Sequence, residues 1–144
     1  LRTVLLRDLK GLQRQVLAYP DDRAPWIDVP GLPNSGGTLV LHLAGNLQHF
    51  VGAVLGASGY VRDRDAEFSR RDVGRAELSA EVQRTIDAVD RALDGFDAAR
   101  LAEPYPLELG GKRVGTGRFL MHLVAHLGYH LGQIDYHRRS TAPT

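Results

Sequence analysis

The sequence predicts an all-α protein, a four-helix bundle formed by a single domain of residues 1–144. Two observations carry this prediction. Four segments repeat apolar residues at steps of three and four, the spacing of one helix face. Stretches rich in Pro, Gly and Asp separate these segments and are typical helix breakers. Four amphipathic helices with two long connections fit a bundle, and a chain of 144 residues can bury roughly 70% of its unfolded surface.

The first two predicted helices lie on either side of a Pro- and Gly-rich connection. The first begins near Leu1 and ends before Tyr19-Pro20. The second covers about residues 36–57. Asn34 or Ser35 is a candidate N-cap for it, because short polar side chains accept hydrogen bonds from first-turn amides.

The last two predicted helices lie on either side of a second long connection, residues 97–115. The third helix is defined by one apolar stripe: Leu78, Val82, Ile86, Val89, Leu93 and Phe96. The fourth begins after Thr116 as N-cap and runs to about Arg138. Between them, residues 105–114 can form either a small hairpin or an extended loop.

Composition excludes several classes of function. The net charge is +1 and the arginines are scattered without stacking aromatics, so we expect no nucleic-acid partner. No apolar run approaches the roughly 18 residues of a membrane span, and the first residues do not read as a signal peptide. The absence of cysteine excludes disulfides, thiolate zinc sites, iron–sulfur clusters and a cysteine nucleophile, and it fits the cytoplasm we expect.

Histidines gather on two narrow helical stripes. His122, His126 and His130 are spaced four apart near the C-terminus, and they span about 80° of one helix face with Gln133 among them. Far upstream, His42 and His49 share a face with Asn46. Both stripes border an apolar stripe, which is where a pocket between packed helices would open.

These stripes favour a divalent metal, because neutral imidazole is a common ligand of zinc, nickel, copper and iron. Two histidines at i and i+4 lie about 6 Å apart and reach one ion together. The outer two of the C-terminal three are about 12 Å apart, so one adjacent pair must be used, and spacing alone does not select it. His137 lies about two turns past His130, and we expect it to be solvated or to face the helix dipole.

Other metal motifs are missing from the sequence. No Glu-x-x-His occurs, which disfavours a di-iron carboxylate bundle, and no His-Glu-x-x-His occurs, which disfavours a zinc-protease helix. The charged stretch of residues 62–68 contains Asp63, Asp65 and Glu67. These carboxylates are candidates for a base or an extra ligand, although their interleaving with Arg62 and Arg64 favours a self-paired surface turn. Glu67 is the strongest candidate, since Phe68 beside it can anchor the turn.

Three pieces of the chain resemble the DinB-like family of metalloenzymes, which includes YfiT-like and thiol-dependent transferase proteins. The pieces are residues 32–47, residues 62–68 and residues 126–134. The most specific are His-Leu-Ala-Gly-Asn at residues 42–46 and His-x-x-x-His-x-Gly-Gln-Ile at the C-terminal end.

The resemblance implies a bundle in up-down-down-up order with nickel or zinc held by three histidines. Carried onto this sequence, the ligands are His42, His126 and His130, with His49, His122 and His137 outside. It further implies a homodimer and a small-molecule substrate, in some relatives with a low-molecular-weight thiol.

Three hypotheses for the function follow. The first is a metal-dependent enzyme of the thiol-transferase or hydrolase type, with Glu67 and Gln133 as its candidate catalytic residues and an open metal position beside a pocket. A metal-bound thiol or water would be the nucleophile. The second is a non-catalytic metal-binding or stress-response bundle. The third is a bundle that binds no metal, in which the histidines are only hydrogen-bonded at the helix edges.

Overall fold

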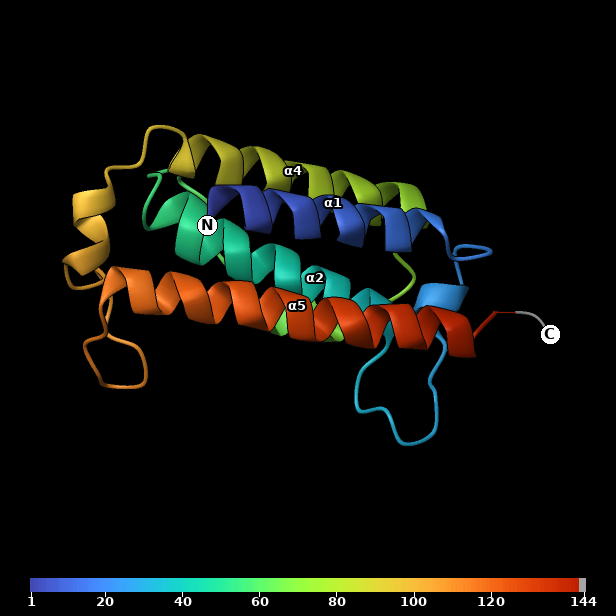
Figure 1. Cartoon of the computed structure of the whole chain (residues 1–144). Helices are drawn as coiled ribbons and strands as arrows, with labels where there is room; N and C mark the ends of the chain where they lie inside the picture. The colour runs from blue at the N-terminus through green and yellow to red at the C-terminus, as the bar shows by residue number, and fades with distance from the viewer. Residues whose placement is uncertain (143–144) are drawn as a thin grey trace.

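The computed structural model describes residues 1–142, and within them four long helices pack side by side. These are α1 (Arg2–Leu17), α2 (Gly36–Leu47), α4 (Arg75–Leu93) and α5 (Thr116–Ser140). Figure 1 shows α1 and α5 running in one direction and α2 and α4 in the other. The predicted all-α bundle in up-down-down-up order is therefore confirmed.

The bundle encloses one core. α1 packs against α4 and α5, and α2 packs against the same two helices. Each of the four helices contributes apolar side chains to this core. The side chains that are fully shielded from solvent include Leu5, Leu9, Leu12, Leu43, Leu47, Leu78, Leu120, Leu127 and Ile134. Burying one such side chain stabilises the fold by about 1.5–3 kcal/mol, so this core fixes how α2 lies against α5.

The helix ends differ from the prediction in detail. The second helix does not continue regularly to residue 57, because it widens into a π-helical segment, η2 (Gln48–Ala53), after Leu47. α4 ends at Leu93, before Phe96, because Gly95 takes a positive φ of 65° that ends helices. Ser35 is confirmed as the cap of α2, since its hydroxyl accepts a hydrogen bond from the Thr38 amide.

The last connection corrects one prediction and decides between two alternatives. The cap of α5 is Gly115, and Thr116 is already the first helical residue. Of the two alternatives for residues 105–114, the extended loop is observed, since no strand occurs in residues 1–142. Two isolated antiparallel pairs close this loop, Pro104 with Gly115 and Leu109 with Lys112.

Short helices complete the described residues: η1 (Ala24–Trp26), α3 (Arg64–Ser69) and η3 (Ala98–Ala102). α3 was not predicted, because six residues are too few for a periodic pattern. It packs against α2. None of the helices in residues 1–142 combines the length and apolar character needed to cross a bilayer.

His137 is buried, so of its two expected placements, solvated or facing the helix dipole, the solvated one is wrong. Its Nε2–H donates to the Ile27 carbonyl oxygen at 2.8 Å, which leaves Nδ1 to accept from the Tyr19 hydroxyl at 2.7 Å. Burial raises the pKa of Tyr19, so the hydroxyl keeps its proton and remains a donor. Gly36 permits this arrangement, because a Cβ there would overlap the Tyr19 hydroxyl. His137 thus ties the end of α5 to two segments from the first quarter of the chain.

Candidate metal centre

Three histidines from two helices meet at one point of the bundle. His42 comes from α2, and His126 and His130 come from α5. Their ligand nitrogens all lie within 4.8 Å of one another. His126 Nε2 is 3.3 Å from His42 Nε2 and 3.1 Å from His130 Nε2. The structure brings together the three residues that the resemblance implied as metal ligands.

The helices place these rings for simple geometric reasons. His126 and His130 are four residues apart, so they project from the same face of α5 one turn from each other. α2 runs antiparallel to α5 and packs against it (Figure 1), which brings His42 to face that pair. His42 is about 9% exposed, so it lies at the border of the core and not on the open surface.

The distances fit a divalent metal. Metal–nitrogen bonds of about 2.0–2.1 Å at octahedral or tetrahedral angles put ligand nitrogens about 2.9–3.4 Å apart. The two observed Nε2–Nε2 distances, 3.3 and 3.1 Å, fall in this range. The three ring planes are also close to perpendicular, at 80°, 87° and 89° to one another. Three imidazoles so arranged could hold one divalent ion together.

The proton positions fit a metal as well. His42 Nδ1 lies 3.0 Å from Glu67 Oε2, and His130 Nδ1 lies 2.6 Å from Gln133 Oε1. Oxygen acceptors at both Nδ1 atoms place the protons there, which leaves both Nε2 atoms as lone pairs. His126 has at most one Nε2 proton, so it cannot donate to the Nε2 atoms of both His42 and His130. A cation bound by the three Nε2 atoms would satisfy all three lone pairs at once.

Glu67 is held in place by a buried ion pair. Its Oε1 accepts from Arg62 Nε at 2.7 Å, and its Oε2 accepts from Arg62 Nη2 at 2.9 Å and from His42 Nδ1. Burial of the carboxylate is the largest single influence on the Glu67 pKa and raises it. The hydrogen bonds from His42 and Arg62 and the positive charge of Arg62 together outweigh burial, so the Glu67 pKa is lowered and the group is ionised at neutral pH.

The predicted self-pairing of residues 62–68 is confirmed for Glu67, which pairs with Arg62, but its predicted surface position is wrong, since Glu67 is only 5% exposed. Two features bring it inward. Asp63 caps α3 by accepting from the Ala66 amide, which orients the short helix. Gly45 on α2 leaves the space that the carboxylate fills, because a Cβ at residue 45 would overlap Glu67 Oε1. Asp65 remains exposed on the outer side of α3.

His126 differs from the other two histidines. Its Nδ1 is buried without a protein partner in the described part of the chain. Burial, followed by the neighbouring imidazoles of His130 and His42, lowers the pKa of His126 to about 4. Burial also lowers the pKa of His130, against the opposing effect of Gln133. Both rings are therefore neutral at physiological pH, the state that binds metal.

The remaining polar residues of the two stripes lie outside the cluster. His122 is exposed and stacks between Phe119 and His126. His49 belongs to the π-helical segment and packs on the neighbouring Phe50. Asn46 is 8% exposed, and its Oδ1 has no hydrogen-bond partner in residues 1–142.

Sequence reasoning did not identify Arg62 and Gly45 as parts of this centre. Arg62 belonged to a charged run with no distinguishing feature, although the Gly45 position within His-x-x-Gly-Asn was available as a signal.

The fold and this centre define a class of protein: a four-helix bundle with a three-histidine cluster suited to a divalent metal. The family model of the DinB superfamily matches residues 5–134, which is most of the chain. The chain belongs to the DinB superfamily. No curated protein sequence matches it, so the comparisons suggest no particular reaction.

Proposed function

We propose that this protein is a metal-dependent enzyme that binds nickel or zinc through His42, His126 and His130 and acts on a small molecule. The observation that carries the proposal is the pair of Nε2–Nε2 distances, 3.3 and 3.1 Å, together with the near-perpendicular rings. The proposed reaction is a thiol-dependent transfer or a hydrolysis. Bound metal of this kind lowers the pKa of a coordinated water to about 7 and deprotonates a coordinated thiol.

The charges around the cluster favour an anionic group at its open side. The three imidazoles are neutral ligands, and the nearby Glu67 carboxylate is neutralised by Arg62 at 2.7 Å. The protein therefore supplies little negative charge to balance a divalent ion. An anion such as a thiolate or hydroxide supplies that balance, and both are the nucleophiles that the proposed reactions need.

Glu67 and Gln133 act in this proposal as positioning residues. Each accepts a hydrogen bond from the Nδ1 of one imidazole, so each fixes the tautomer and the ring orientation. The ionised Glu67 also increases the basicity of His42. Neither side chain is placed to take a proton from substrate, because both oxygens of Glu67 are engaged and Gln133 has no basic group.

Cobalt reconstitution tests the proposal. The metal-free protein is loaded with Co²⁺, and N-acetylcysteine is added while the near-ultraviolet absorption is recorded. We expect a sulfur-to-cobalt charge-transfer band, because the open side of the cluster accepts the thiolate. The band should be absent from His42→Ala and present in His122→Ala, the matched control for an exposed histidine of α5 outside the cluster.

If Co²⁺ binds and no thiol or other exogenous anion alters its spectrum, the metal position is closed. The enzyme proposal then fails, and the hypothesis of a non-catalytic metal-binding protein remains. If Co²⁺ does not bind at all, the metal proposal itself fails.

A further inference from the structure

An apolar pocket of about 360 Å³ lies between α2 and α5, about one helical turn from His42 and His130. It is lined by residues 32–34 of the connection before α2, by Leu39 of α2, and by Gly132, Gln133 and Tyr136 of α5. Its volume lies in the range of small-molecule sites, roughly 300–1,000 Å³.

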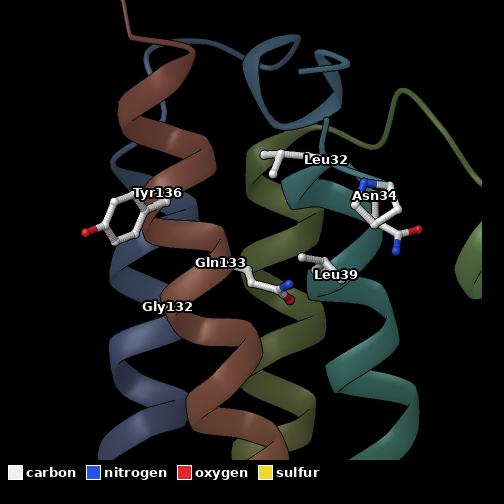
Figure 2. A pocket seen from close by; sticks show the side chains of 7 residues that line it. Leu32, Asn34, Leu39, Gly132, Gln133 and Tyr136 are labelled. Atoms are coloured by element: carbon white, nitrogen blue, oxygen red, sulfur yellow. The ribbon is translucent and has the colours of Figure 1, made fainter. Parts of the chain in front are cut away.

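The pocket joins the candidate metal centre through Gln133. In Figure 2 the Gln133 side chain extends from α5 into the space in front of Leu39, with Leu32 lying above both. The same side chain accepts the hydrogen bond from His130 at 2.6 Å. On the opposite wall, Leu39 precedes His42 by three residues on α2. A molecule in the pocket therefore contacts the residue that orients one imidazole.

The lining chemistry selects an uncharged occupant. None of the lining residues carries a charge, and Leu32, Pro33 and Leu39 supply aliphatic surface. Their few polar groups are the amides of Asn34 and Gln133, whereas the Tyr136 hydroxyl points away from Leu32 and Leu39 (Figure 2). A charged group here would lose hydration without gaining a partner, whereas an aliphatic chain or an aromatic ring buries its surface against the leucines.

Gly132 contributes to the width of the pocket. A Cβ built at Gly132 meets no atom within 4 Å, so a side chain introduced there extends into free space and not into the core. Gly128, one turn earlier on α5, is equally open but does not line the pocket. The two glycines form a matched pair for an experiment.

We propose that this pocket binds the apolar, uncharged part of the substrate and directs its reactive polar group toward His42, His126 and His130. This inference rests on the proposed enzymatic function and adds the substrate class: a small molecule with an alkyl or aryl body and one polar end. Gln133 is then a specificity residue, because it contacts both the substrate and His130.

The pocket is tested without metal by titrating metal-free protein with N-phenyl-1-naphthylamine, an uncharged dye that brightens in apolar surroundings. We expect saturable brightening with the native chain and with Gly128→Leu. Gly132→Leu should bind the dye at least about tenfold more weakly, or about 1.4 kcal/mol, because its side chain fills the pocket. Light scattering on all three proteins checks that neither substitution changes the oligomeric state. Equal dye binding by Gly132→Leu and the native chain, or no saturable binding by the native chain, would overturn the proposal.

The link to the metal is tested with two hydroxamates on the cobalt-loaded protein. Acetohydroxamate binds metal without an apolar tail, and octanohydroxamate adds one. We expect the native chain to prefer octanohydroxamate by at least about tenfold, and Gly132→Leu to lose this preference while still binding acetohydroxamate. If acetohydroxamate leaves the cobalt spectrum unchanged, the proposed function fails. If both hydroxamates bind equally well to the native chain, the metal accepts an exogenous ligand, but the proposal that the pocket binds the apolar part of the substrate is refuted.

Discussion

Gly45→Ala should weaken metal binding at the candidate centre while the protein keeps its fold. Gly45 lies on α2, and a Cβ at this position would stand 2.7 Å from Glu67 Cδ and closer still to Oε1. Ordinary contact begins at 3.4 Å, so the carboxylate must move by at least about 0.7 Å away from α2. The hydrogen bond from His42 Nδ1, now 3.0 Å, then exceeds the usual range of about 2.7–3.2 Å.

The expected cost falls on metal affinity. Removing the partner that orients a metal-binding histidine weakens metal binding about 10- to 100-fold, which is about 1.4–2.7 kcal/mol. The fold itself should survive, because alanine favours a helix over glycine by roughly 0.5–1 kcal/mol and offsets part of the steric strain.

Competitive titration with a chromophoric zinc chelator measures the affinity, and urea unfolding of the metal-free protein measures stability. Gly128→Ala is the control, since its new methyl group meets nothing within 4 Å. It should be as stable as the native chain or slightly more so, with unchanged affinity. Zinc binding by Gly45→Ala as tight as that of the native chain would refute the reasoning that Glu67 holds His42 in position.

Three further outcomes are expected. Glu67→Gln keeps the shape of the side chain but removes its charge, so zinc affinity measured by the same chelator should fall about 10- to 100-fold; an unchanged affinity would exclude the positioning role. Tyr19→Phe leaves Nδ1 of the buried His137 without a donor and should lower the free energy of unfolding by about 1–3 kcal/mol in urea, with zinc affinity unchanged. The metal-free protein should lose stability as the pH falls from about 6.5 toward 4, because the pKa of His126 is lowered to about 4 and the unfolded chain takes up the proton first. His126→Ala should show a shallower pH dependence of unfolding, and an identical slope in both proteins would contradict this assignment.

The four long helices could be predicted because the apolar spacing that identifies each helix lies within that helix. The apolar stripe on α1, for example, recurs every three or four residues and ends at Tyr19-Pro20 whatever the rest of the chain does. The helix pair His126 and His130 is local in the same sense. The choice of this pair over the one with His122 came from the resemblance to the family, because spacing alone allowed both.

Long-range contacts limited the prediction of the site. Glu67 lies in a run of alternating charges, which is normally solvated, and the space at Gly45 and the hydrogen bond from His42, more than twenty residues earlier, cannot be seen from that run. His137 was expected to be solvated or to face the helix dipole near the end of α5, yet Tyr19, 118 residues away, completes its buried hydrogen bonds. Such pairings depend on how helices pack, which helical periodicity does not encode.

The central claim is that His42, His126 and His130 hold one metal ion. The most direct test is the metal content of protein prepared without an affinity tag or a nickel column, then dialysed against zinc and nickel, beside His126→Ala and His122→Ala. We predict about one ion per chain in the native protein and in His122→Ala, and a large loss in His126→Ala. No bound metal in the native chain, or equal metal in the native chain and His126→Ala, would contradict the account.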